Sequence, residues 1–256
     1  MKPLSRLVTG TATALALILG TPAAQAFDLG AMTAEERAAF GAEVRAYLMQ
    51  NPEVILEAVN LLEQQQAAHE ANRDDALVAA NLEELHNDGY SWVGGNPNGD
   101  ITLVEFLDYR CGYCRKAAPE VAKLLQADGN IRLIVKEFPI LGEGSVMASR
   151  FAVATKQVAG DEAYKQAHDA LIEMGSELNE VSMRRLAEGL SLDADAILAA
   201  MDSEAVTEEL RRTRALAQNL AISGTPTFVL GNQLLRGYLP ADQLKIMVDE
   251  QREENS

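Results

Sequence analysis

Hydrophobic and polar positions divide the chain into an apolar leader, a helical segment, and a region in which strands and helices alternate. The leader is an uncharged apolar run over residues 7–20, preceded by Lys2 and Arg6 and followed by Ala24-Gln25-Ala26. This order is typical of a cleaved secretory signal peptide. A membrane anchor is the alternative, but the run is shorter than the roughly 18 to 20 apolar residues that cross a bilayer. We therefore expect residues 1–26 to be removed and the mature protein to be soluble.

Residues 27–86 have helical periodicity and form the predicted N-terminal region. Thr33 and Glu36 have the spacing of a capping box, and Asn51 with Pro52 predicts the start of a second helix. Apolar side chains recur on one face of these helices: Phe40, Val44, Tyr47, Leu48, Ile55, Val59 and Leu62. Such helices bury little surface alone, so they pack either on the chain's own globular domain or on copies of themselves as an oligomerisation stalk. Periodicity leaves both alternatives open.

Residues 87–256 are predicted to form an α/β domain. The Gly-, Asn- and Pro-rich composition over 87–100 predicts a linker, and the apolar runs at 101–107 and 131–138 predict two buried strands. Helical periodicity over 117–126 places a helix between these strands. The result is a β-α-β unit with both cysteines at its first strand-to-helix junction.

An all-helical insert and a closing hairpin follow. Cap and glycine stop signals predict four or five helices, over residues 145–160, 161–175, 179–189 and from 193 to 224, which places the insert at about 145–223. Gly231-Asn232, flanked by short apolar runs, fits the two-residue turn of a β-hairpin. Helical periodicity over 240–251 closes the domain.

The composition and net charge of the chain restrict the kinds of molecule that it is expected to bind. The chain has 256 residues, of which 48% are hydrophobic, as expected of a globular protein. Its formal net charge of −16 becomes more negative by two if the segment with Lys2 and Arg6 is removed. Phosphate binding needs Lys and Arg, so nucleic acid is disfavoured as a partner.

The two cysteines of the chain, Cys111 and Cys114, are separated by only two residues. A stabilising disulfide normally closes a longer loop, because the entropy removed from the unfolded chain grows with loop length. In an exported protein this spacing favours a redox-active pair. Unpaired N–H groups and the dipole of the following helix favour a thiolate with a lowered pKa at Cys111, the expected nucleophile. Cys114, one turn further in, is expected to resolve the mixed disulfide.

A metal site is the alternative use of two cysteines. Tetrahedral zinc needs four ligands, and the sequence has no second C-x-x-C and no closely spaced His pair. Copper(I), which accepts two thiolates, is compatible with the pair but is not favoured. His69, His86 and His168 are isolated, and we expect them to be surface or helix-face residues. We therefore expect no metal and no cofactor beyond the redox-active Cys111–Cys114 disulfide.

Three segments, at residues 104–114, 136–142 and 224–229, resemble the DsbA-like branch of the thioredoxin superfamily: VEFLDYRCGYC, KEFPILG and GTPTFV. The resemblance extends over residues 93–252, and residues 47–62 are more weakly similar to the helical stalk of the trimeric ScsC-type isomerases. It implies a thioredoxin fold with an all-helical insertion, preceded by an N-terminal α-helical oligomerisation stalk.

The resemblance also implies which residues meet the substrate. Pro226 is expected to be a cis proline that faces the cysteine pair, and X-Pro is the bond at which a cis peptide is least costly. Thr225 is expected to offer its backbone to an extended substrate peptide. Gly112 and Tyr113, between the cysteines, are expected to lie at the same substrate surface.

Glu105 stands six residues before Cys111, where the family keeps a buried acid near the second cysteine. Burial raises a carboxyl pKa, so Glu105 is expected to take or deliver a proton when Cys114 reacts. The alternative is a glutamate at the solvent edge of its strand. Lys136 is a candidate partner for Glu105.

The residues between the cysteines influence whether the pair oxidises client thiols or reduces and isomerises client disulfides. Gly-Tyr here, with Thr before the cis proline, looks like the bacterial disulfide isomerases, whereas strong DsbA oxidases carry Pro-His and Val. We therefore expect a periplasmic disulfide isomerase or reductase that acts on cysteine-containing exported proteins. It is expected to be oligomeric through its N-terminal helices, with a trimer favoured, and kept reduced by a membrane thiol-disulfide partner. A monomeric dithiol oxidase and a copper(I)-binding protein of a copper-tolerance system are the alternatives.

Overall fold

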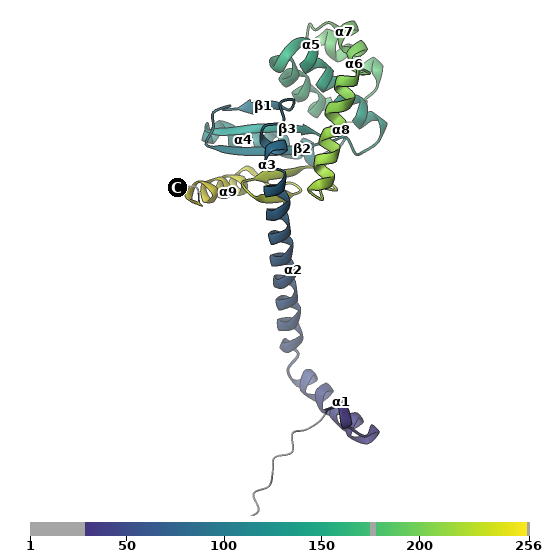
Figure 1. Cartoon of the computed structure of the whole chain (residues 1–256), viewed down its shortest axis with the longest axis vertical. Helices are drawn as coiled ribbons and strands as arrows, with labels where there is room; N and C mark the ends of the chain where they lie inside the picture. The colour runs from purple at the N-terminus through teal and green to yellow at the C-terminus, as the bar shows by residue number, and fades with distance from the viewer. Residues whose placement is uncertain (1–28, 175–177, 255–256) are drawn as a thin grey trace, which may run out of the picture. The chain divides into compact units, whose positions relative to one another are not determined.

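A computed structural model of the chain describes residues 29–174 and 178–254. The predicted signal peptide at 1–26 and the predicted helix end at Gly175 lie outside the described residues. Within the described ranges, no helix has both the length and the apolar character needed to span a membrane. The chain divides into two compact units, one up to Leu61 and one from Leu62 onward. Figure 1 labels the helices α1 to α9 and the strands β1 to β3.

The first unit contains a short 3₁₀ helix η1 (Leu29–Ala31), helix α1 (Ala34–Gln50) and the start of α2 (Glu53–Ala80). The predicted capping box is confirmed: Thr33 Oγ1 accepts from the Glu36 N–H at 3.2 Å, and the Thr33 N–H donates to Glu36 Oε2 at 2.8 Å. The predicted role of Asn51 as the cap of the second helix is wrong. Asn51 Nδ2 donates to the Tyr47 carbonyl at 2.9 Å, so Asn51 closes the end of α1 instead.

The second unit is built on a five-stranded mixed sheet with the strand order β1-β3-β2-β4-β5. The strands are β1 (Trp92–Gly95), β2 (Ile101–Leu107), β3 (Ile131–Glu137), β4 (Thr227–Leu230) and β5 (Gln233–Arg236). β2 and β3 are parallel and are joined by α4 (Gly112–Asp128), while the other pairs are antiparallel. The predicted β-α-β unit and the hairpin turn at Gly231-Asn232 are therefore confirmed.

Strand β1 lies in the segment that the sequence predicts to be a linker. It is short and contains Gly94 and Gly95, so it shows no alternation of apolar and polar residues. Antiparallel pairing with β3 holds it in place. The Trp92 ring stacks on Tyr164 with 5.4 Å between centroids, and its Nε1 donates to the Asp161 carbonyl at 3.1 Å. A Cβ on Gly94 would come within 2.0 Å of the Trp92 ring, so glycine makes room for this packing.

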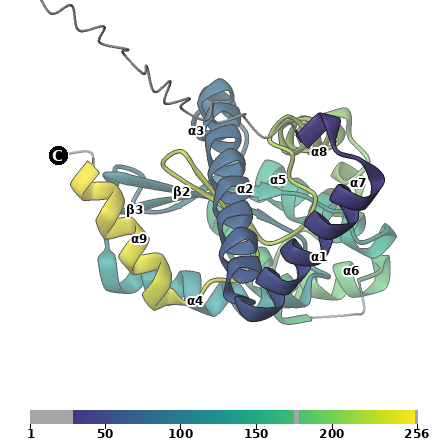
Figure 2. The ribbon, with the colours of Figure 1, turned by 90° about the horizontal axis from the view of Figure 1, so that it is seen from below.

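Helices cover both faces of the sheet. One face, with Leu103, Leu107 and Val135, packs against α4, α5 (Glu143–Met174) and α9 (Ala241–Glu254). The other, with Val104 and Phe106, packs against the end of α2, α3 (Leu82–His86) and α8 (Glu204–Asn219). Helices α4 and α9 lie side by side (Figure 2).

The second half of α2 belongs to the compact unit that contains the sheet. Val78 and Leu85 are fully buried, and Arg236 on β5 donates to Asp74 Oδ1 at 3.0 Å. The polar stretch at 64–75 lies within α2, which is helical from Glu53 to Ala80. The domain boundary that we expected at residue 87 falls inside this unit.

Helices are the regular elements of the predicted insert among its described residues, joined by short turns. It consists of α5, α6 (Glu180–Gly189), α7 (Ala194–Ala200) and α8. The predicted break at Gly160 appears as a kink within α5, where Gly160 has φ 85°. The stretch predicted as helical from residue 193 contains two helices, α7 and α8, because Ser203 caps a new helix with its side chain.

Candidate active site

The cysteine pair lies where β2 ends and α4 begins. Cys111 is the N-cap residue of α4, and Cys114 lies in the first turn of this helix. Both are free thiols, with exposed fractions of 7% for Cys111 and 0% for Cys114. Cys111 therefore lies at the end of α4 that bears unpaired N–H groups and the positive end of the helix dipole.

Asp108 ties this junction to the segment after β3. The buried carboxylate accepts from the Arg110 N–H at 2.8 Å and from Ser145 Oγ at 2.8 Å through Oδ1. Its Oδ2 accepts from the N–H groups of Ile140 and Leu141 at 2.7 and 3.0 Å. No sequence motif singled out Asp108, although an aspartate directly after a buried strand is a common acceptor of backbone N–H groups.

Thr225 and Pro226 are far from the cysteine pair in the sequence, but the fold brings Thr225 into contact with Cys111. The Cys111 Sγ donates to the Thr225 carbonyl at 3.1 Å, although the two residues are 114 positions apart. The Thr225–Pro226 peptide bond is cis, and Pro226 is buried. The Pro226 carbonyl accepts from the Gly237 N–H at 2.9 Å. The turn before β4 therefore presents a backbone carbonyl to the more exposed of the two sulfurs.

Cys114 is enclosed behind Cys111. Burial raises the pKa of the Cys114 thiol well above its ordinary value, and the nearby charges of Cys111 and Glu105 add to the rise. Cys114 therefore keeps its proton at neutral pH. The two sulfurs differ in exposure and in chemical environment, as a nucleophile and a resolving thiol require.

Glu105 is buried in the hydrophobic layer on the cysteine side of the sheet, with an exposed fraction of 5%. Among residues 29–174 and 178–254, no side chain or backbone group forms a hydrogen bond with its carboxyl. Desolvation raises the pKa of Glu105 to about 8, and the charge on Glu137 contributes. Glu105 is therefore a neutral acid at pH 7, able to donate a proton.

Lys136 does not pair with Glu105, so the candidate pairing is wrong. Residues alternate along a strand, and Lys136 lies on the face opposite to Glu105. There its buried ammonium forms an ion pair with Asp88 and donates to the Glu84 carbonyl at 2.8 Å. Lys136 thus joins β3 to the segment around α3.

A buried network around Glu137 was not found from the sequence. Glu137 accepts from the Tyr109 and Tyr164 hydroxyls at 2.7 and 2.6 Å and from Ser149 Oγ at 2.7 Å. Desolvation raises the pKa of Glu137 to about 7, while these three hydrogen bonds oppose the rise. The only sequence signal was a charged residue at the end of a predicted buried strand. Tyr109 connects the network to the cysteine pair, because it lies two residues before Cys111.

His168 belongs to this network, so its prediction as a surface or helix-face residue is wrong. The ring is partly buried, its Nδ1 lies 3.0 Å from the Tyr109 hydroxyl, and it stacks on Tyr164. Desolvation lowers the pKa of His168 to about 4. The ring is therefore neutral at pH 7. By contrast, His69 is exposed on α2, as predicted.

The residues between the cysteines lie at the surface. Gly112 is exposed, and Tyr113 has an exposed fraction of 64%. Side chains here are accessible to another polypeptide. Within the part of the chain that the structure describes, no group of three or more His, Cys, Asp or Glu side chains is placed to hold a metal ion.

The DSBA-like thioredoxin domain matches residues 102–249, a range that contains both cysteines and Pro226. The chain belongs to this family. A second match, to the Copper resistance protein ScsC N-terminal domain, covers residues 36–69. The DSBA-like domain is thus preceded by helices of a type found in ScsC proteins.

Solved structures show the same relationship. A thioredoxin-like oxidoreductase from Silicibacter pomeroyi DSS-3 is 43% identical and covers 67% of this chain and 97% of its own, with a TM-score of 0.63. BcfH from Salmonella enterica Typhimurium is 28% identical over 85% of this chain and 96% of its own, with a TM-score of 0.71. Proteus mirabilis ScsC in a transitional conformation is 26% identical over 87% of this chain and 100% of its own, with a TM-score of 0.63.

Curated relatives include much longer proteins. The Na(+)/H(+) antiporter NhaA 3 of Salinispora tropica is 29% identical over 145 residues, which are 57% of this chain and 22% of that protein. The matched part of this chain therefore spans about a fifth of the length of the antiporter.

Proposed function

We propose that the protein is a periplasmic thiol-disulfide oxidoreductase that reduces or isomerises disulfide bonds in cysteine-containing exported proteins. One observation carries the proposal: the Cys111 sulfur lies at the head of α4 against the Thr225 carbonyl beside cis Pro226, with Cys114 buried behind it. The DSBA-like family, whose domains are generally thiol-disulfide oxidoreductases, supports the reaction type.

The reaction begins when the Cys111 thiolate attacks one sulfur of a client disulfide. The second client sulfur leaves as a thiolate, and a mixed disulfide forms between Cys111 and the client. For reduction, deprotonated Cys114 then attacks the Cys111 sulfur, which forms the Cys111–Cys114 disulfide and releases the first client sulfur as a thiolate. For isomerisation, a client thiolate attacks the mixed disulfide instead and regenerates Cys111.

Glu105 is the proposed proton donor and acceptor for Cys114. At neutral pH it holds a proton, since desolvation raises its pKa to about 8. When a thiolate attacks Cys111 of the oxidised pair, Cys114 leaves as a thiolate and Glu105 donates its proton to that sulfur. In the reverse direction, the ionised Glu105 carboxylate removes the same proton. The redox equivalents reside in the cysteine pair, so the proposal needs no bound cofactor but does need a membrane thiol-disulfide partner to reduce the pair.

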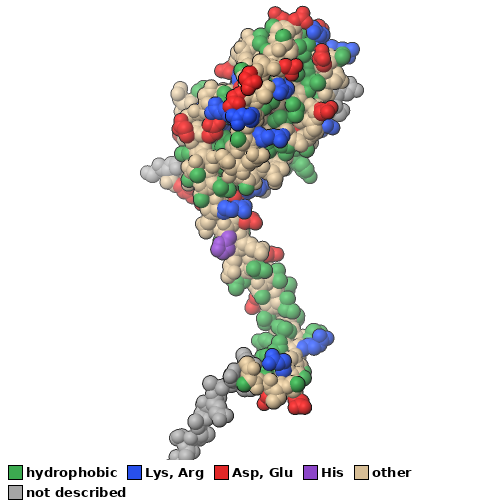
Figure 3. Space-filling model, turned by 45° about the vertical axis from the view of Figure 1, so that its right-hand side comes forward, with side chains coloured by type: hydrophobic (Ala, Val, Ile, Leu, Met, Phe, Trp, Pro, Cys, Tyr) green, Lys and Arg blue, Asp and Glu red, His purple; other side chains and the backbone are tan. Residues whose placement is uncertain are grey.

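The N-terminal helices support an oligomeric isomerase rather than a monomeric oxidase. No residue of α1 is buried. Large apolar side chains along α1 and the first part of α2 have exposed fractions between 40% and 71% (Figure 3): Phe40, Val44, Tyr47, Met49, Ile55, Leu56, Val59 and Leu61. Exposed apolar side chains gathered in one segment mark association surfaces. We propose that these helices associate with copies of the same chain, with a trimer favoured, and present several cysteine pairs to one client.

Recovery of scrambled ribonuclease tests the proposal. We expect wild type to restore ribonuclease activity and Cys111→Ala to restore none. A variant that lacks residues 27–62 should become monomeric in solution, still react with small disulfides, and lose most of the recovery. A monomeric wild-type protein that oxidises reduced peptides rapidly, but does not recover scrambled ribonuclease, would instead be a dithiol oxidase. Stoichiometric retention of copper(I), unchanged by Pro226→Ala, would indicate the copper-binding alternative.

A further inference from the structure

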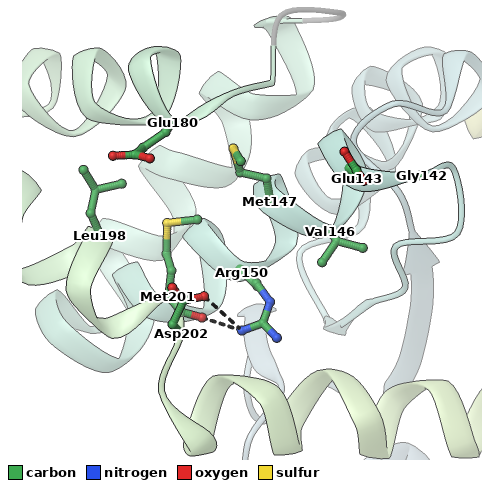
Figure 4. Close-up of a pocket in the computed structure, with 9 residues that line it drawn as sticks. All are labelled: Gly142, Glu143, Val146, Met147, Arg150, Glu180, Leu198, Met201 and Asp202. Carbon is green, nitrogen blue, oxygen red and sulfur yellow. Dashed lines mark hydrogen bonds and ion pairs between the residues drawn. The ribbon is translucent and has the colours of Figure 1, made fainter.

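A cavity of about 590 Å³ opens between the first turns of α5 and the helices α6 and α7. Its apolar lining comes from Val146 and Met147 on α5, Leu198 on α7, and Met201 just after α7. In Figure 4 the Met201 side chain extends into the space between Leu198 and Met147. Two methionines make this lining adaptable, because the unbranched thioether side chain changes shape at little cost.

The cavity adjoins the cysteine pair through the segment that follows β3. Gly142 lines the cavity, and its neighbour Leu141 accepts a hydrogen bond from Arg110 Nη1 at 2.7 Å through its carbonyl. Arg110 directly precedes Cys111. The Leu141 side chain has an exposed fraction of 43%. An extended polypeptide joined to Cys111 that passes over Arg110 and Leu141 therefore reaches the cavity within a few residues.

Acidic side chains dominate the mouth of the cavity. Glu143, Glu180 and Asp202 contribute three carboxylates, against the single guanidinium of Arg150. Arg150 already donates to the Met201 carbonyl at 2.6 Å and lies 3.9 Å from Asp202 (Figure 4). Among the residues that the structure describes, the Glu143 and Glu180 side chains form no ion pair or hydrogen bond. The mouth thus has two carboxylates available for a cation.

We propose that this cavity is a client-binding subsite that takes an apolar side chain flanked by Lys or Arg in the polypeptide whose cysteine reacts with Cys111. The proposal rests on the proposed function and names its preferred substrate class. The lining of Val146, Met147, Leu198 and Met201 removes the apolar side chain from water. Glu143 and Glu180 pair with the adjacent cation, so the subsite selects for charge as well as for size.

Two peptides that differ only in charge test the selectivity. Each carries one cysteine as a mixed disulfide with glutathione, and a Leu-Lys-Lys or Leu-Glu-Glu segment within about five residues of it, a span of roughly 17 Å when extended. The measurement is kcat/KM for reduction by the reduced full-length protein. We expect wild type to prefer the basic peptide about fivefold at low ionic strength and to lose most of this preference in high salt.

Charge reversal at the mouth should invert the preference. In Glu143→Lys/Glu180→Lys we expect the ratio of the two kcat/KM values to fall below one. Glu188→Lys/Glu250→Lys is the matched control, because it changes the net charge equally at two exposed helix positions outside the cavity. This control should keep the wild-type preference. A purely structural role of Glu143 and Glu180 as first-turn acids would lower the melting temperature without changing the ratio.

Binding without reaction provides the second readout. A Leu-Lys-Lys peptide with serine in place of cysteine is titrated into protein with ¹³C-methyl methionine, and Met147→Leu and Met201→Leu assign the two resonances. We expect both methyl resonances to shift, and to shift less when Ser replaces the peptide Leu. Unshifted methyls, or a peptide preference that charge reversal leaves unchanged, would overturn the subsite. If wild type reduces neither peptide, the proposed function fails, and the methyl shifts still decide whether the cavity binds such segments.

Discussion

Glu105 and Glu137 lie on the same face of adjacent parallel strands, and neither carboxyl has a cation partner among the described residues. The register of β2 and β3 aligns Glu105 with Val135 and Leu107 with Glu137, which places the two carboxyls two positions apart. Desolvation is the main cause of both raised pKa values, about 8 for Glu105 and about 7 for Glu137. The hydrophobic layer beneath the cysteine pair therefore contains two acids that ionise near neutral pH.

The stability of the protein should depend on pH through Glu105. Its folded-state pKa of about 8 lies above the ordinary value of 4.5, so between these pH values the folded protein binds more protons than the unfolded chain. This stabilisation is complete below about pH 4.5 and is lost as the pH rises through about 8. The free energy of unfolding should fall by a few kcal/mol over this range, since one pKa unit corresponds to about 1.4 kcal/mol.

Urea denaturation across this pH range measures the effect. Glu105→Gln, which does not ionise, should flatten the fall in the free energy of unfolding. The exposed substitution Glu188→Gln is the control and should leave the slope as in wild type. A slope in Glu105→Gln equal to that of wild type would show that Glu105 is not the group responsible.

Tyr109→Phe should destabilise the folded protein. The Tyr109 hydroxyl donates to Glu137 at 2.7 Å and lies 3.0 Å from His168 Nδ1. Its loss removes one of the three hydrogen bonds to Glu137 and leaves His168 Nδ1 without this partner. Such a loss costs about 1–3 kcal/mol. It should also raise the pKa of Glu137 further, because the hydrogen bond from Tyr109 lowers that pKa.

Urea denaturation at neutral pH tests the Tyr109 prediction. Tyr113→Phe is the matched control, since Tyr113 is exposed, and it should change the free energy of unfolding by no more than about 0.5 kcal/mol. Equal effects of the two substitutions would contradict an energetic role for the Glu137 network.

Lys136→Met should reduce stability without slowing the reduction of small disulfides by folded protein. Removal of Lys136 leaves Asp88 charged and buried, a loss that costs about 3–5 kcal/mol. The surface substitution Lys123→Met, which breaks an exposed pair with Glu120, should cost no more than about 1 kcal/mol. Lys136 lies on the sheet face opposite to Glu105. Slower turnover per folded molecule would therefore mean that Lys136 influences the cysteine pair after all.

Cys114→Ser should trap clients on Cys111. Without the second sulfur, the mixed disulfide at Cys111 cannot be resolved internally and should accumulate during reaction with a peptide disulfide. Cys111→Ser should form little adduct, because the remaining sulfur, Cys114, is fully buried. Mass spectrometry of the unreduced proteins counts the adducts. Comparable amounts on the two variants would contradict the assignment of the two sulfurs.

The helices, most strands and the position of the cysteine pair at the start of α4 could be predicted because they depend on short stretches of chain. The capping box at Thr33, the buried run at 101–107 and the turn at Gly231-Asn232 each act within a few residues. The spacing of Cys111 and Cys114 ahead of a helix is also a local feature. Strand β1 could not be predicted in this way, because its glycines carry no periodic signal and its pairing with β3 supplies its hydrogen bonds.

By itself, the sequence determined the order of the elements after β1, the position of the cysteine pair ahead of a helix and the likeness to the DsbA-like branch. Only the tertiary structure decided that Lys136 pairs with Asp88 and that His168 joins Tyr109 beside Glu137. Those contacts depend on strand order, register and the helices that cover each face. Burial then raises or lowers each pKa, because desolvation depends on the surroundings in space rather than on neighbours along the chain.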